Sequence, residues 1–122
     1  MSRKVFVNHT NHPSRGWDEA QKHAAMSYGE IVDVPFPSIA PEAGEEEVRS
    51  LAERNAGKIL ELEPEAVLCQ GEFTYTYAMV DLLKKHGILT LAASSERIVE
   101  EVQRNGMTQK VSLFQFVRFR SY

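Results

Sequence analysis

The sequence predicts an α/β protein with a small, mostly parallel sheet covered by helices on both faces. Short apolar runs typical of buried strands alternate with segments whose apolar residues recur at helical spacing. An Asn-Gly pair near the C-terminal end, between two strand-capable runs, predicts an antiparallel hairpin. A chain of 122 residues is the length of one ordinary domain, so we expect a single domain over residues 1–122.

The first half predicts two strands and the helix between them. Residues 4–7 form a short apolar run that ends at the polar stretch 8–14, as a buried strand entering a loop would. A helix is expected over 17–28, with Gly29 at its C-terminal cap. The second strand covers 30–34 and ends at Pro35, which cannot donate to a ladder.

The next segments repeat this alternation. The clearest helix covers 45–62, with three glutamates in its first turn and Pro64 beyond its end. A strand over 66–69 and a helix capped by Thr74 follow. A fourth strand over 88–93 then leads into a polar turn, 94–97.

Residues 97–104 fit either a short helix or a strand, and Asn105-Gly106 favours a hairpin that pairs them with 111–119. With right-handed crossovers, the simplest topology is a Rossmann-like, doubly wound sheet of order 2-1-3-4-5, closed by an antiparallel C-terminal hairpin strand.

Composition excludes several classes of function. Fourteen Lys and Arg against seventeen Asp and Glu give a net charge of −3, which argues against binding duplex DNA through a broad basic face. One cysteine excludes an internal disulfide framework and a cysteine-based zinc site. The sequence shows no signal peptide and no membrane-spanning apolar run, so we expect a soluble cytoplasmic protein of a reducing compartment.

Polar segments follow the first, third and fourth predicted strands. In doubly wound sheets, ligands bind outside the carboxyl ends of the strands, close to the switch in strand order. We therefore expect these three segments to meet at one rim and bind a small ligand. The candidate binding residues are Asn8, Thr10, Asn11, Arg15, Gln70, Gly71, Glu72, Thr74 and Ser94.

Several of these residues also have simpler interpretations. His9 and His12 lack a third ligand at diagnostic spacing, so no metal site is predicted, and either histidine fits loop packing or proton transfer. The turn from Gly71 to Thr74 could hold an anion at a helix N-terminus, or simply cap the helix.

The other candidate residues also have both a functional and a structural interpretation. Ser94, Ser95 and Arg97 form a hydroxyl-plus-guanidinium group suited to phosphate, or a solvated turn. Cys69 is expected to be a buried packing residue, and one of Tyr75 and Tyr77 is expected to point inward. The phenylalanines of the C-terminal strand either form a dimer surface or cover the sheet edge; they are Phe114, Phe116 and Phe119.

Three segments together resemble the small CRISPR-associated Rossmann-fold (CARF-like) proteins, including the stand-alone ring nucleases. They are Val5-Phe6-Val7-Asn8-His9-Thr10-Asn11-His12-Pro13, Ile31-Val32-Asp33-Val34-Pro35 and Ser94-Ser95-Glu96-Arg97. The resemblance implies a homodimer that binds a cyclic oligoadenylate of type III CRISPR antiviral defence. The family's ligand-contacting positions match Asn8, Thr10, Ser94, Ser95 and Arg97.

The resemblance further implies ring cleavage without metal or cofactor. The substrate's own 2′-hydroxyl would attack the adjacent phosphate, so positioning and charge stabilisation would suffice. Arg97 would steady the developing charge, Ser94 or Ser95 would hold phosphate oxygens, and His9 or His12 would transfer a proton.

Two other functions stay open. Gly71-Glu72 before an aromatic helix loosely resembles nucleoside deoxyribosyltransferases, in which a carboxylate, here Glu72, attacks the sugar carbon. The chain could also be a nucleotide-binding module without chemistry.

Overall fold

The computed structural model describes residues 3–122 and confirms the predicted α/β architecture. Its five-stranded sheet has the order β2-β1-β3-β4-β5, parallel except for the antiparallel β4–β5 pair. The strands are β1 (Val5–Thr10), β2 (Glu30–Asp33), β3 (Ala66–Gln70), β4 (Leu89–Arg104) and β5 (Met107–Ser121). The helices are α1 (Glu19–Met26), α2 (Glu45–Glu61) and α3 (Phe73–Lys85), with a 3₁₀ turn, η1, at Ser14–Gly16.

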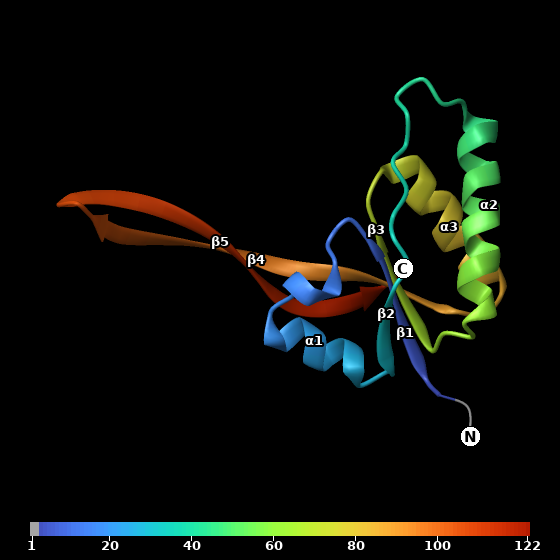
Figure 1. Cartoon of the computed structure of the whole chain (residues 1–122), viewed down its shortest axis with the longest axis horizontal. Helices are drawn as coiled ribbons and strands as arrows, with labels where there is room; N and C mark the ends of the chain where they lie inside the picture. Colours follow the sequence, from blue (N-terminus) through green and yellow to red (C-terminus); the bar gives the residue numbers. More distant parts are fainter. Residues whose placement is uncertain (1–2) are drawn as a thin grey trace.

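The sheet separates two apolar cores, one under each helical layer. Helices α2 and α3 pack over one face, and α1 covers the other (Figure 1). Successive side chains of β1 point to opposite faces of the sheet. Val5 and Val7 pack in the core under α2 and α3, whereas Phe6 lies fully buried with Trp17 on the α1 side. No helix of residues 3–122 is long and apolar enough to span a bilayer.

Beyond the sheet, β4 and β5 continue as a two-stranded ribbon that projects from the body of the molecule (Figure 1). We call residues 95–116 the arm; its ten cross-strand pairs run from Ser95↔Phe116 to Arg104↔Met107. The predicted Asn105-Gly106 hairpin is confirmed, because both residues have the positive φ, 52° and 74°, of a two-residue turn.

The expected polar turn at 94–97 is wrong, since these residues belong to β4. A register shift between Ser94 and Ser95 leaves Val117 as the extra residue opposite them, so the strand bends there instead of ending. The sequence looked like a turn because both faces of this stretch are largely solvated, which removes the half-buried alternation of a strand.

Smaller corrections concern the ends of elements. β1 extends to Thr10, so Asn8, His9 and Thr10 lie in a buried strand and not in a loop. Helix α1 begins at Glu19, where Asp18 caps the Gln21 N–H. Gly29 has no positive φ and caps no helix; it lies so close to the Lys4 backbone that a Cβ would come within 2.6 Å of it.

Candidate functional site

The carboxyl ends of β1 and β3 lie side by side at the switch in strand order, as predicted. The two strands are paired in parallel up to Thr10↔Gln70. The Gln70 side-chain amide extends this edge to β4: its Oε1 accepts from the Ala93 N–H at 2.9 Å and its Nε2 donates to the Ala93 carbonyl at 3.4 Å. Polar groups of the three strands therefore meet at one rim, distributed between the two faces of the sheet.

On the α1 side, a hydrogen-bonded cluster fixes the loop that follows β1. The Asn8 amide donates to the His12 carbonyl at 2.9 Å and to Asp33 Oδ1 at 3.1 Å, and Thr10 Oγ1 donates to Asn8 Oδ1 at 2.9 Å. The Trp17 indole N–H also reaches the His12 carbonyl, at 3.0 Å. The buried side chains of Asn8 and Thr10 are thus satisfied within the protein and hold the loop in place.

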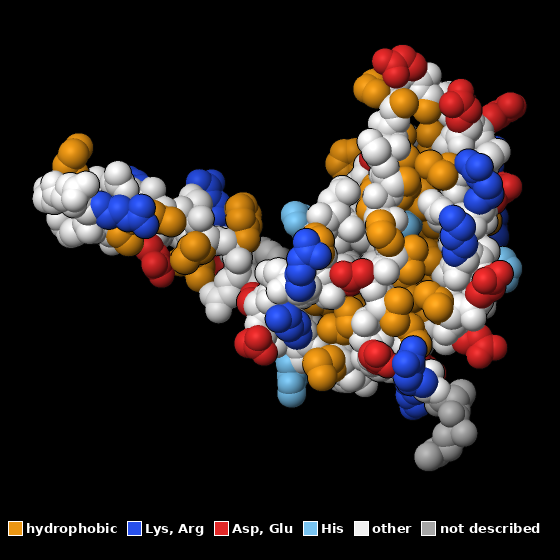
Figure 2. All heavy atoms as spheres, in the orientation of Figure 1, with side chains coloured by type: hydrophobic (Ala, Val, Ile, Leu, Met, Phe, Trp, Pro, Cys, Tyr) orange, Lys and Arg blue, Asp and Glu red, His pale blue; other side chains and the backbone are white. Residues whose placement is uncertain are grey.

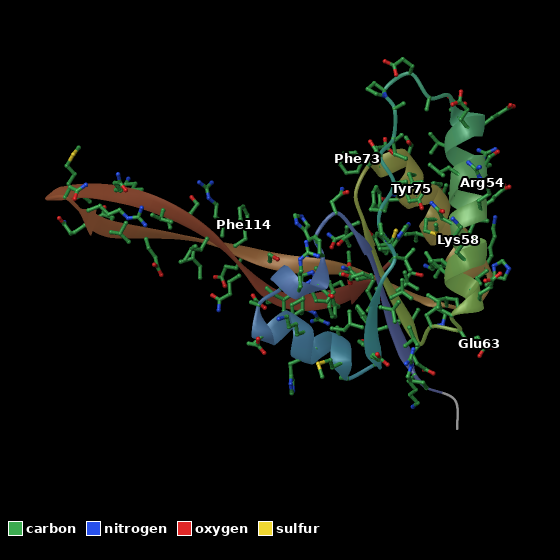
Figure 3. The ribbon with its side chains drawn as sticks, in the orientation of Figure 1. Arg54, Lys58, Glu63, Phe73, Tyr75 and Phe114 are labelled. Atoms are coloured by element: carbon green, nitrogen blue, oxygen red, sulfur yellow. The ribbon has the colours of Figure 1, made fainter. Side chains whose placement is uncertain are left out.

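His9 belongs to the opposite core, where it is fully buried. Its Nδ1 lies 2.7 Å from the Val34 carbonyl, which can only accept, so Nδ1 carries the proton and Nε2 accepts from the Tyr75 hydroxyl at 2.6 Å. The Asn55 amide donates to that hydroxyl at 3.0 Å. Figure 3 shows Tyr75 pointing from α3 into the interior.

This chain of hydrogen bonds joins β1, the segment after β2, α2 and α3. Burial lowers the pKa of His9, outweighing the opposing effect of the Val34 carbonyl, so the imidazole is neutral at pH 7. Both ring nitrogens of His9 are bonded inside the core, in a strand and not in the loop where the sequence placed this residue.

The start of α3 is capped by a carboxylate. Glu72, and not the predicted Thr74, is the cap: its Oε1 accepts from the Tyr75 N–H at 2.8 Å and from Thr74 Oγ1 at 2.7 Å. These bonds, the hydroxyl first, lower the pKa of Glu72. The helix N-terminus that an anion would need is therefore occupied by a negative charge of the protein itself.

A cationic cluster lies at the base of the arm, on the face opposite α1. Ser94 pairs with Arg118 across the β4–β5 ladder, and the Arg120 guanidinium donates to Ser94 Oγ at 3.0 Å. Arg118 and Arg120 are two residues apart on one strand, so both side chains leave the same face. Within residues 3–122, neither guanidinium forms an ion pair.

Sequence reasoning missed these two arginines because they lie in β5, far along the chain from Ser94. The predicted group of Ser94, Ser95 and Arg97 is not what the structure assembles. Arg97 belongs to the arm, where it donates to Ser112 Oγ at 2.9 Å. The signal that could have found Arg118 and Arg120 is their i, i+2 spacing in a strand expected to return beside Ser94.

Three other predicted residues are exposed near the rim. Asn11, His12 and Arg15 are exposed on the loop after β1. Gly71 passes against the Phe36 ring, which a Cβ would meet at 2.2 Å. Among residues 3–122, no three metal-ligating side chains of His, Cys, Asp or Glu cluster together.

Cys69 and Tyr75 are buried as predicted, whereas Tyr77 is 77% exposed. Burial raises the pKa of the Cys69 thiol to about 12, which keeps it protonated and unreactive at neutral pH. The aromatic residues of β5 divide: Phe116 and Phe119 pack together over Phe6 and the α1 side, but Phe114 is 74% exposed.

Comparison with known proteins identifies a family. Residues 4–120 match the model of the Uncharacterized protein MJ1673 family, which covers nearly the whole chain, so the protein belongs to that family. No curated protein matches the sequence significantly.

Proposed function

We propose that this member of the MJ1673 family binds a small phosphate-containing nucleotide, of the cyclic oligoadenylate class, at the rim formed by β1, β3 and the base of the arm. The observation that carries the proposal is the position of Arg118 and Arg120 beside Ser94, with no ion pair to either guanidinium among residues 3–122. Guanidinium groups bind phosphate through forked, permanently charged donors, and a hydroxyl adds a further contact.

The topology supports this location. The β1–β3 end of the rim lies where the strand order reverses, which is the usual ligand position in doubly wound sheets, and the arginine pair lies on β5, two strands from β3. Local cations also reconcile anion binding with a net charge of −3, because an anion responds to the nearest charges more than to the total. The resemblance to CARF-like proteins supplies the ligand class.

We do not assign His9 or Arg97 a part in cleaving the ligand. His9 uses both ring nitrogens in the core, and Arg97 bonds to Ser112 in the arm. His12 is exposed on the rim and is the histidine that could exchange a proton with a bound ligand. Any ring cleavage would thus depend on His12 and on the arginine pair.

Calorimetric titration of the full chain with cyclic tetra- and hexa-adenylate, in the presence of EDTA, tests the proposal. We expect one of these two cyclic oligoadenylates to bind. Arg120→Ala should weaken that binding about tenfold or more, since a hydrogen bond to a charged group contributes about 1.5–3 kcal/mol. Arg97→Ala removes the same charge from the arm and should leave the affinity unchanged. Mass spectrometry of the recovered ligand separates cleavage from simple binding.

The proposal fails if neither ring binds, or if Arg97→Ala weakens binding as much as Arg120→Ala does. The second result would indicate that the ligand binds at the group predicted from the sequence, Ser94, Ser95 and Arg97.

A further inference from the structure

The two faces of the arm carry different sets of side chains. Paired residues of an antiparallel ladder share a face, and faces alternate along each strand. One face carries polar cross-strand contacts: Arg97 to Ser112 at 2.9 Å and Gln103 Nε2 to Thr108 Oγ1 at 2.9 Å. The same face also carries two exposed apolar side chains, Val99 (54%) and Phe114 (74%), which lie on either side of the ladder.

The other face carries an apolar stripe. Its aliphatic side chains are those of Ile98, Val102, Met107, Val111 and Leu113. Met107 is 67% and Leu113 47% exposed, and exposed apolar side chains lie along the arm in Figure 2. The arm projects from the body in Figure 1, so the body does not cover this stripe.

A two-stranded ribbon of this kind is marginally stable alone and needs a further layer over its apolar face. We propose that this layer is the same face of the arm of a second copy of the chain. The proposal is independent of nucleotide binding.

Charge complementarity favours a second copy over an unrelated partner. Arm residues 95–116 contain three acidic and three basic side chains, hence no net charge, although the whole chain carries −3. On the apolar face, Glu100 and Arg104 flank Val102 at equal distances along β4. The sequence around Val102 is therefore complementary to itself when one copy is reversed.

Two arms stacked antiparallel, strand over strand, with a two-fold axis at Val102, use this symmetry. Glu100 of each copy then faces Arg104 of the other, twice, and Val102 meets its own counterpart. By the cross-strand register, Val111 of one copy faces Met107 of the other. Val102, Val111 and Met107 of each copy are covered, Ile98 and Leu113 lie opposite the partner's Asn105-Gly106 turn, and Glu100 and Arg104 are paired.

Sedimentation analysis of the full chain and four variants tests this arrangement. The wild type should be a dimer. Glu100→Arg and Arg104→Glu should each raise the dimer dissociation constant about tenfold or more, because each places like charges together twice. The double variant, Glu100→Arg with Arg104→Glu, should restore the affinity, since the attraction returns with its signs exchanged.

Gln103→Arg is the control, since it adds a positive charge next to Val102 on the polar face. It should leave the dissociation constant unchanged. Circular dichroism establishes that each variant folds. A monomeric wild type, a failure of the double variant to recover, or an equal effect of Gln103→Arg would each overturn the proposal.

Discussion

His9 shows how a polar side chain in the core can be mistaken for a catalytic residue when only the sequence is known. His9 follows the first apolar run and has the residue type of a proton-transfer group, yet it lies in the core with both nitrogens bonded. The sequence cannot distinguish these roles, because the partners of His9 lie 25 and 66 residues away. Cys69 was easier to interpret, since its strand is apolar throughout.

The Tyr75 hydroxyl should contribute measurably to stability. Tyr75→Phe leaves His9 Nε2 without its donor inside the core, which should lower the free energy of unfolding by about 1–3 kcal/mol. Denaturant unfolding measures the change. Tyr77→Phe is the matched control, because Tyr77 is 77% exposed and should be neutral; equal effects of both variants would contradict the hydrogen-bonding account.

Stability should also fall in mild acid because of His9. Burial lowers the pKa of the folded imidazole below the ordinary 6.5, so its stabilising effect is complete above pH 6.5. Below that pH, the unfolded chain binds the proton first, and the free energy of unfolding decreases.

Melting temperatures measured between about pH 7.5 and pH 5.5 should show this decline. His9→Gln keeps one donor and one acceptor but does not titrate, so its curve should be flatter, even from a lower starting stability. Parallel curves for the two proteins would assign the pH dependence to other groups.

Among the secondary-structure elements, the buried strands and their helices could be predicted from the sequence, whereas the strand segment at the base of the arm, which is solvated on both faces, could not. The alternation of apolar strands and helices predicted the sheet order, because the central strands β1 and β3 are buried on both faces. The arm was identified only through its Asn-Gly turn. Its base was read as a turn, since Ser94, Ser95 and Glu96 show no apolar alternation. The arginine pair was consequently missed.

Two glycines separate helix propensity from close packing. Gly57 is exposed within α2 and a Cβ there meets no atom within 4 Å, so Gly57→Ala should raise the free energy of unfolding by about 0.5–1 kcal/mol.

Gly29→Ala makes the same chemical change where the new Cβ would come within 2.6 Å of the Lys4 backbone. It should lower the free energy of unfolding by about 1–3 kcal/mol, because backbone must move to admit the methyl group. Denaturant unfolding of both variants measures the difference. Changes of the same sign would contradict this packing of the α1–β2 turn against β1.

At the scale of the whole molecule, the body and the arm obey different constraints. The body buries two apolar cores against its sheet, whereas the arm displays an apolar stripe that its own chain does not cover. Phe114, labelled on the arm in Figure 3, remains exposed on the opposite face. A dimer formed through the arms would leave the rim of each body free for a ligand.

The central claim is that Ser94, Arg118 and Arg120 hold the phosphate of a small nucleotide. The most direct measurement is an amide NMR spectrum of the isotope-labelled full chain during titration with cyclic oligoadenylate. The account predicts that the largest shifts occur at these three residues and at Gln70, with smaller shifts at the arm tip. Shifts concentrated elsewhere in the chain, or no shifts at all, would contradict it.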